Sequence, residues 1–332
     1  MRALIVLPGA LGDVIRGLPL AGRLRQAHPQ ATLGWVVEPL SMPLLDGHPW
    51  LDHVHRFDRR RGVVGMVAVL RDVRRVGYDV VLDLGRSAKS ALIGLGSGTA
   101  RRIGFARADS REGAWLAATE QLPPQGVARS KLEQFLAFGE RLGATDGTIA
   151  FGLAPSTAEG ARAGALVGEV HGPLVAACVG SSCPSRRWWP ERTAAVLDAL
   201  HARHGTTGLL LGASADVEFG AAVTAAARSP VRDLTGRTTL RELLAVLAQT
   251  RLAFGPDSGA LHLAAALGVP VVSLWGATSA LRSAPLGSEH LVVTGPAPCS
   301  PCFLTRCPIG RVCMQSIDVA RVVDRSMEGL AA

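Results

Sequence analysis

Short apolar runs that stop at a glycine or proline turn and lead into a helix recur along this chain, and this pattern constrains its fold most. Residues 2–7 form the first run, which stops at Pro8-Gly9 before a helix that begins near Asp13. Such a pattern predicts a strand, a tight turn and a helix. Because strands that alternate with helices pair in parallel and are covered on both faces, the chain is predicted to be α/β.

The alternation forms two sets, separated by residues 151–172, which are rich in Ala, Gly and Pro and lose the strand pattern. In the first set we expect further strands at 32–37, 54–57, 79–83 and 102–105, with helices at 63–76 and 131–142. In the second set we expect strands at 174–179, 208–211, 252–254 and 271–274, with helices at 190–204, 217–227, 240–249 and 258–267. The halves share no residue-level repeat, so we predict two domains of similar architecture.

Length and composition agree with two globular domains. The 332 residues suit two cores of roughly 150 residues each. Hydrophobic residues make up 48% and charged residues 19% of the chain, which excludes a disordered protein. No apolar run reaches the roughly 18 residues that a membrane-spanning helix needs, so a soluble protein is expected.

The net charge of +8 comes almost wholly from arginine, because Lys89 and Lys131 are the only lysines. Arginine binds phosphate through two parallel hydrogen bonds. A basic protein can meet nucleic acid, an anionic membrane surface or a phosphorylated substrate. Aromatic residues are only 5% of the chain and do not interleave with basic runs, which makes nucleic acid the weakest of these partners.

The turn from Gly9 to Asp13 follows the first strand, at the sheet edge where ligands of parallel α/β folds bind. Asp13 has two interpretations: an N-cap of the following helix, or a general base. The spacing does not match the dinucleotide fingerprint G-x-G-x-x-G, although Glu38 stands where a ribose-binding acid would lie. A dehydrogenase is therefore a weaker alternative.

Two further turns carry polar groups suited to a phosphate. Residues 254–262 place Asp257, Ser258 and His262 around a predicted helix N-terminus, where free N–H groups bind anions; the alternative is a capped helix with a core histidine. Residues 180–190 combine small residues with two arginines, which suits a pyrophosphate. The alternative there is an exposed loop whose Trp188 and Trp189 fill the edge of a core.

Four of the six cysteines lie in one short segment with the spacing C-x2-C-x4-C-x5-C: Cys299, Cys302, Cys307 and Cys313. This segment is compact enough to surround one tetrahedral metal ion. Because no standard zinc-finger spacing matches, reduced thiols and two disulfides remain alternatives.

Together these motifs resemble glycosyltransferase family 9, the ADP-heptose:lipopolysaccharide heptosyltransferases, along nearly the whole chain. The stretches that carry the resemblance are 4–14 with Leu18-Pro19, 35–38, 83–90, 102–105, 111–113, 187–190, 212–218 and 257–262. The cysteine cluster is also similar to one in a branch of this family.

The resemblance implies a GT-B fold, in which two Rossmann-like domains with parallel sheets face a central cleft. Residues 1–160 would bind the acceptor and residues 161–318 the nucleotide sugar, while a helix at 319–332 would cross back to the first domain. The implied reaction is inverting transfer of heptose from ADP-heptose to a lipopolysaccharide inner-core acceptor.

The resemblance also implies roles for single residues, with Asp13 as the catalytic base. The implied donor-binding residues are Ser182, Arg187, Asp216, Asp257, Ser258, Gly259 and His262. The implied acceptor-binding residues are Gly12, Arg59, Arg60, Arg61 and Arg111. Catalysis would need no cofactor, and a structural zinc or iron would fit only the four-cysteine cluster.

The implied location is the cytoplasm, with peripheral contact at the inner membrane surface and no nucleic-acid partner. One alternative is an enzyme of the same fold that uses another nucleotide sugar or a protein acceptor, or a sugar-nucleotide epimerase. A more distant one is a metal-dependent module that binds nucleic acid through the cysteine cluster and the positive charge.

Overall fold

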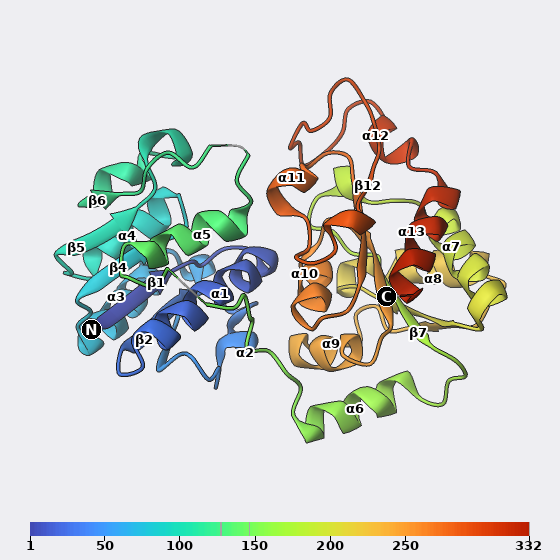
Figure 1. Ribbon diagram of the computed structural model, residues 1–332, viewed down its shortest axis with the longest axis horizontal. Helices are drawn as coiled ribbons and strands as arrows, with labels where there is room; N and C mark the ends of the chain where they lie inside the picture. The colour runs from blue at the N-terminus through green and yellow to red at the C-terminus, as the bar shows by residue number, and fades with distance from the viewer. Residues whose placement is uncertain (127, 146, 332) are drawn as a thin grey trace. The chain divides into compact units, whose positions relative to one another are not determined.

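The computed structural model describes residues 1–126, 128–145 and 147–331, and it divides into two compact units, each built around one parallel sheet (Figure 1). The first unit spans Met1–Leu153 and the second Ala154–Ala332. The boundary therefore lies a few residues before the predicted one at 160, because the helix that begins at Thr157 packs on the second unit.

The sheet of the first unit has the strand order β3-β2-β1-β4-β5-β6, and all its pairings are parallel. Its strands are β1 (Arg2–Val6), β2 (Thr32–Val37), β3 (His53–Arg56), β4 (Val80–Asp83), β5 (Arg101–Gly104) and β6 (Glu120–Gln121). The order reverses at β1, where Val6 lies between Val36 of β2 and Asp83 of β4. Ligands of such folds bind outside the carboxyl ends of the strands at this reversal.

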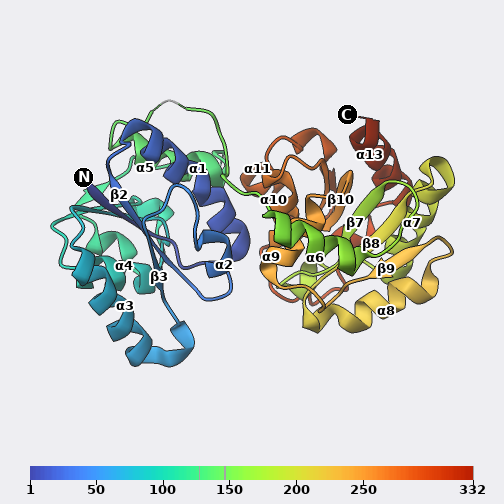
Figure 2. The same cartoon turned by 90° about the horizontal axis from the view of Figure 1, so that it is seen from below.

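Helices cover both faces of the first sheet (Figure 2). They are α1 (Leu11–Ala27), α2 (Met42–Leu45), α3 (Gly62–Val76), α4 (Ala88–Gly96) and α5 (Lys131–Glu140), with the 3-10 turns η1 (Arg59–Arg61), η2 (Arg107–Asp109) and η3 (Ala114–Ala117). One face packs on Val69 and Val73 of α3 and on Ile93 of α4. On α1, a Cβ at Gly17 would lie 2.8 Å from the ring of Trp35, so only glycine lets this helix approach the sheet.

The second unit repeats this topology, with the order β12-β11-β10-β7-β8-β9. Its strands are β7 (Leu174–Cys178), β8 (Thr207–Leu211), β9 (Val231–Asp233), β10 (Leu252–Pro256), β11 (Val271–Trp275) and β12 (Val293–Thr294). The order reverses between β7 and β10, which pair with each other. Every strand predicted from the sequence is present, whereas β6, β9 and β12, each of two or three residues, were not predicted.

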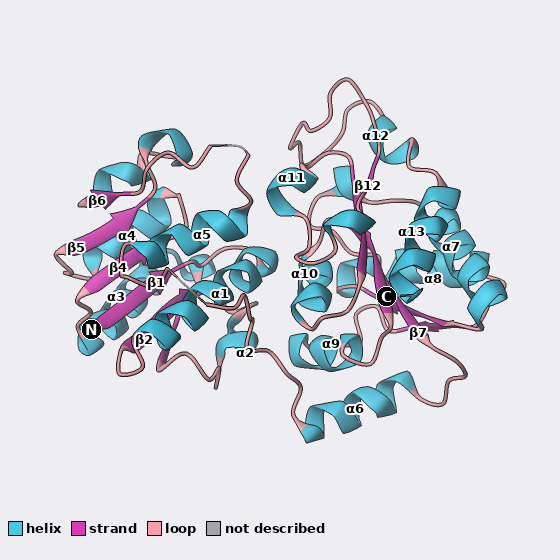
Figure 3. Ribbon diagram, in the orientation of Figure 1, coloured by secondary structure: helices cyan, strands magenta, loops and turns pink. Residues whose placement is uncertain are grey.

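The helices of the second unit lie on both faces of its sheet (Figure 3). They are α6 (Thr157–Val167), α7 (Pro190–His204), α8 (Val217–Ala226), α9 (Leu240–Leu247), α10 (Gly259–Ala266), α11 (Ala280–Ser283), α12 (Val312–Gln315) and α13 (Val319–Ala331), with the 3-10 turns η4 (Pro184–Arg186), η5 (Ser214–Asp216) and η6 (Glu289–Leu291). Serine or threonine N-caps with glutamate three residues later begin α5, α6 and α9.

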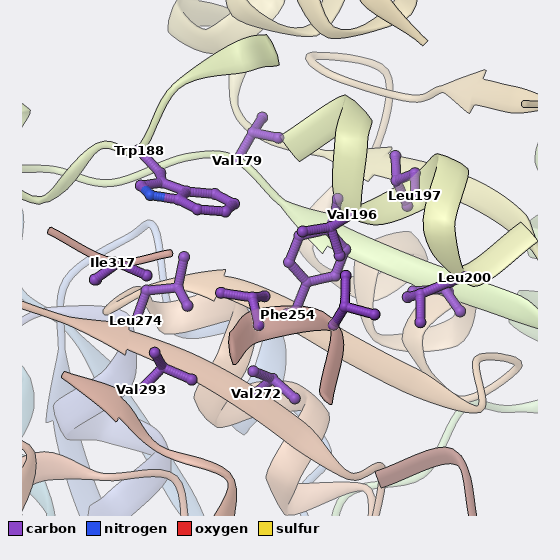
Figure 4. Close-up of a cluster of buried hydrophobic side chains, with 14 of the residues drawn as sticks. Val179, Trp188, Val196, Leu197, Leu200, Phe254, Val272, Leu274, Val293 and Ile317 are labelled. Carbon is purple, nitrogen blue, oxygen red and sulfur yellow. The ribbon is translucent and has the colours of Figure 1, made fainter. Parts of the chain in front are cut away.

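A continuous apolar core joins α7 to β10 and β11, with Trp188 above Leu274 and Phe254 near Val196 (Figure 4). Trp188 is only 3% exposed, so the interpretation of this residue as a core side chain is correct. Val322 and Val323 of α13 belong to the same core, and α13 packs on α7, β10 and β11. The last helix is thus part of the second unit, which differs from its predicted return to the first domain, because its apolar face is buried here.

No helix among the described residues is both long and apolar enough to cross a membrane.

Candidate functional site

Asp13 lies in the first turn of α1, directly after the turn at the carboxyl end of β1. The helix begins at Leu11, and its N-cap is Ala10, so the N-cap interpretation of Asp13 is wrong. The Asp13 carboxylate instead faces two cations: Arg16 Nη1 and Lys131 Nζ donate to Oδ1 at 2.6 and 2.7 Å. The three side chains are between one-tenth and one-quarter exposed. Two ion pairs on one oxygen fix the orientation of this carboxylate.

Lys131 was not expected at this site, because 118 residues separate it from Asp13. It is the first residue of α5, and α5 packs along α1, which brings the two side chains together. Its rarity was a usable signal, since it is one of only two lysines in an arginine-rich chain. Gly12, a predicted acceptor-binding residue, is buried beside Asp13 in the same turn of α1.

The predicted acceptor-binding arginines do not form a single cluster. Arg59, Arg60 and Arg61 form η1 after β3, and Arg59 Nε lies 3.5 Å from Glu38 Oε2. Arg111 follows β5, and its N–H donates to the carbonyl of Arg86. Three strands, β2, β1 and β4, separate β3 from β5, so the two groups lie on either side of the turn that carries Asp13. At about 4.8 Å per strand they are roughly 19 Å apart across the sheet.

Between these groups, the end of β4 carries a half-buried carboxyl group, Asp83. Burial raises the pKa of Asp83 to about 6, although the N–H of Gly85 donates to Oδ1 at 2.9 Å. Arg86, which follows Gly85, has a left-handed backbone with φ of 59°, which is unusual for a residue other than glycine. Its guanidinium stacks 3.7 Å over the ring of Phe105 and donates to Gln134 of α5, one turn beyond Lys131. The cationic Arg86 therefore lies at the same sheet edge as Asp13.

In the second unit, the turn after β7 meets the turn after β8. Arg187 Nη2 donates to Asp216 Oδ1 at 2.7 Å, and the N–H of Ala213 donates to Asp216 Oδ2 at 2.9 Å. Asp216 is buried against Gly180, where a Cβ would lie 2.5 Å from Asp216 Oδ2. Two predicted donor-binding residues, Arg187 and Asp216, thus form one ion pair at this edge.

Asp257 organises the turn after β10. Its Oδ2 accepts hydrogen bonds at 3.0 Å from Thr278 Oγ1 and, as an ion pair, from Arg186 Nη1. His262 Nε2 lies 3.7 Å from Asp257 Oδ1, and both residues are buried. The hydroxyl of Ser181 donates to the Asp257 carbonyl at 3.4 Å, which ties the turn after β7 to the turn after β10. The sequence identified Asp257 and His262 but not Arg186 or Thr278 as its partners.

Several buried hydrogen-bond donors lack an acceptor among the described residues, and three of them are hydroxyl or guanidinium groups of these turns: Ser258 Oγ, Arg186 Nε and Arg187 Nε. Ser258 precedes α10 as its N-cap, but its side chain caps no N–H. Buried donors without acceptors cost about 1–3 kcal/mol each and need an explanation. Two guanidinium N–H groups and a hydroxyl at a helix N-terminus are what an anionic ligand would satisfy.

The remaining predicted donor residues lie in the same turns. Gly259 is the first residue of α10, and Ser182 is exposed on the loop after β7, 3.9 Å from Cys183 Sγ. The backbone approaches closely here: Gly255 has φ of 150°, and a Cβ on it would lie 2.2 Å from the carbonyl oxygen of Cys178. Only glycine therefore lets β10 end against β7.

The four-cysteine segment is the predicted site of a structural metal ion. All six cysteines are free thiols, and no group of three His, Cys, Asp or Glu side chains within the described residues is placed to hold a metal ion. Cys313 is buried at the start of α12 while Cys299 is exposed, so the chain directs these thiols into different surroundings. Burial raises the pKa of the Cys313 thiol, and the other three thiols add to this rise.

Comparison with known proteins identifies the family of this chain. Residues 66–312 match the family model described as glycosyltransferase family 9 (heptosyltransferase). The chain is 26% identical over 288 residues to the lipopolysaccharide core heptosyltransferase OpsX of Haemophilus influenzae, covering 86% of this chain and 82% of that protein.

Two solved structures are similar over almost the whole chain. One is a family 9 glycosyl transferase from Veillonella parvula, with a TM-score of 0.87, 20% identity, and coverage of 99% of this chain and 97% of the other. The other is the ADP-heptose lps heptosyltransferase II of E. coli, with a TM-score of 0.80, 22% identity, and coverage of 100% and 99%. With the two parallel sheets, these likenesses confirm the predicted α/β fold of the GT-B type.

Proposed function

Because the chain belongs to glycosyltransferase family 9, we propose that this glycosyltransferase moves heptose from ADP-heptose to a lipopolysaccharide inner-core acceptor with inversion at the anomeric carbon. The names of its relatives, lipopolysaccharide core heptosyltransferase and ADP-heptose lps heptosyltransferase, support both substrates. The observation that carries the proposal is the set of three buried donors without acceptors at the carboxyl edge of the second sheet.

In this proposal the second unit binds the donor. The diphosphate accepts hydrogen bonds from Arg186, Arg187 and Ser258, and from the free N–H groups at the start of α10, including Gly259. Ser182 adds a hydroxyl from its exposed loop. Three buried side chains complete the set: Asp257 and His262 orient the sugar, and Asp216 orients the ribose.

The first unit supplies the base. The Asp13 carboxylate accepts the proton of the acceptor hydroxyl while that oxygen attacks the anomeric carbon. The bond from this carbon to the diphosphate oxygen breaks, and its electron pair leaves with ADP. Because negative charge grows on the diphosphate, the cationic groups that bind it stabilise the transition state more than the ground state. We propose that these groups replace a catalytic metal, so turnover should be unchanged in EDTA.

The inner-core acceptor is anionic, and we propose that Arg59, Arg60 and Arg61 on one side and Arg111 on the other bind its acidic groups, with Gly12 beside the attacking hydroxyl. Both groups flank Asp13 along the sheet edge. The protein would then work at the cytoplasmic face of the inner membrane, where a lipid-borne acceptor is anchored.

The test is ADP release measured with ADP-heptose in the presence and absence of a Kdo-bearing lipid A acceptor. Asp13→Asn should lower kcat by about 10²–10⁴-fold, the usual contribution of a general base, while calorimetry shows unchanged donor affinity. Asp46→Asn, at an exposed aspartate of the same unit, is the matched control. Normal turnover of the Asp13 variant would refute the base, and thermal stabilisation by UDP-sugars but not by ADP-heptose would refute the donor.

A further inference from the structure

Helix α3 of the first unit carries valines that the described residues of this unit leave exposed. Val63, Val64 and Val67 are 79%, 59% and 49% exposed, whereas Val69 and Val73 of the same helix are each 1% exposed against the sheet. Isolated exposed apolar residues are common, but three within five residues of one helix form a patch. The helix therefore has one apolar side that the fold buries and a second that it leaves in water.

The same outer side turns basic along the helix. Val63, Val67, Arg71 and Arg75 recur every four residues and so form one stripe, with Val64 beside it. Arg71 is exposed, and the side chain of Arg75 is 73% exposed, with its Nη1 3.5 Å from Oδ1 of the half-exposed Asp72. We call Val63, Val64, Val67, Arg71 and Arg75 the α3 face. Arg74 is not included, because its Nε donates to the carbonyl of Gly96 on the neighbouring helix α4.

Charge around the α3 face is strongly one-sided. Residues 56–75 contain seven arginines and only two aspartates, Asp58 and Asp72. Arg60 and Arg61, directly before the helix, are exposed and form no ion pair within the described residues. The valines thus have arginines before them in η1 and after them on the helix, over a length of roughly 18 Å along the helix axis from Val63 to Arg75.

We propose that the α3 face docks on an anionic lipid bilayer. The valines enter the boundary between headgroups and acyl chains, and the arginines bind lipid phosphates while their methylene stems cover apolar surface. A helix with a short apolar stripe and flanking cations suits this interface, and charge complementarity selects anionic over neutral lipid. The inference rests on the proposed function in one respect: a lipid-borne acceptor would place the substrate of the enzyme at a membrane surface.

The experiment is flotation of the full-length chain with vesicles of phosphatidylcholine containing about 30% phosphatidylglycerol, compared with vesicles of phosphatidylcholine alone. We expect binding to the anionic vesicles that weakens as salt rises. Replacing Val63, Val64 and Val67 by Ser should weaken binding by about tenfold. The pair Arg71→Gln and Arg75→Gln should weaken it by roughly 30-fold, at about 1 kcal/mol per cation.

Ile309→Ser is the matched control, because this residue of the second unit is 57% exposed and should not affect binding. All variants change exposed side chains, so their circular dichroism and thermal midpoints should match those of the original chain. Equal binding to both kinds of vesicle, or a valine variant that binds as tightly as the original chain, would overturn the proposal. A concentration-dependent dimer that the valine variant abolishes would assign the α3 face to a second copy instead.

Vesicle binding needs no turnover, which separates this inference from the proposed function. A chain that binds vesicles but transfers no heptose would refute the function and leave the docking surface standing. With a water-soluble, deacylated acceptor, the valine variant should keep the turnover of the original chain. Loss of that turnover would place the valines in the acceptor site and overturn the docking surface.

Discussion

Glu159→Gln removes one charge from an ion pair that joins α6 to α9 in the second unit. Arg241 Nε and Nη2 donate to Glu159 Oε1 and Oε2, both at 2.7 Å, and the N–H and hydroxyl of Ser156 donate to Oε2 at 2.8 and 3.0 Å. Glu159 is only 9% exposed. Four hydrogen bonds to one carboxylate, led by those from Arg241, lower the pKa of Glu159 to about 2.

The low pKa sets the size and pH range of the effect. The folded chain favours ionised Glu159, so its stabilisation is present above pH 4.5 and is lost as the pH falls through about 2. Linkage gives a contribution of about 3 kcal/mol to the free energy of unfolding at pH 7, and roughly half of that at pH 3. Because glutamine cannot ionise, the difference between the original chain and Glu159→Gln should shrink by about 2 kcal/mol between pH 5 and pH 3.

Urea unfolding at both pH values measures this difference, and hydrogen exchange of the α6 and α9 amides assigns it to the second unit. Glu169→Gln is the matched control, because Glu169 is an exposed glutamate two residues after the end of α6. A double-mutant cycle with Arg241→Gln isolates the coupling. A difference that stays constant from pH 5 to pH 3 would refute the ionised pair as the source of stability.

Three further predictions concern the site. Lys131→Met should lower kcat by about tenfold or more without changing donor KM, because Asp13 loses one of the cations that orient it. Lys131→Arg should recover part of the rate. Steady-state kinetics measure both variants, and an unchanged kcat for Lys131→Met would contradict this role. Ser258→Ala should weaken ADP binding by about fivefold to tenfold in calorimetry, since the proposed role of the hydroxyl is to donate a hydrogen bond to a phosphate. Equal affinity would exclude that role. Because burial raises the pKa of Asp83 to about 6, the folded chain keeps a proton that the unfolded chain releases from about pH 4 upward. This group should therefore lower the free energy of unfolding of the original chain by about 2 kcal/mol from pH 4.5 to pH 7. In urea denaturation of Asp83→Asn, the free energy of unfolding should not show this decrease.

The two α/β units, their strands and the turns that carry Asp13, Arg187 and Asp257 could all be predicted from the sequence. These features depend on local patterns, such as apolar runs of strand length, glycines where the backbone turns, and helix-forming periodicity. The short strands β6, β9 and β12 were missed because two or three residues carry no recognisable pattern.

Only the tertiary structure determined which side chains meet. The pairing of Lys131 with Asp13 depends on α5 packing along α1, and the pairing of Arg186 with Asp257 depends on β7 lying beside β10. For the four cysteines, close spacing in the sequence suggested a metal site, but among the described residues no three such side chains are placed to hold a metal ion.

The sequence by itself therefore determined the fold class, the family resemblance and the turns that we propose bind ligands, because each follows from short-range patterns. The tertiary structure decided that Asp13 is held by two cations instead of capping its helix, that three buried donors lack acceptors, and that α13 belongs to the second unit. The physical reason is that these contacts join residues far apart in the chain, and their geometry is set by how helices and strands pack.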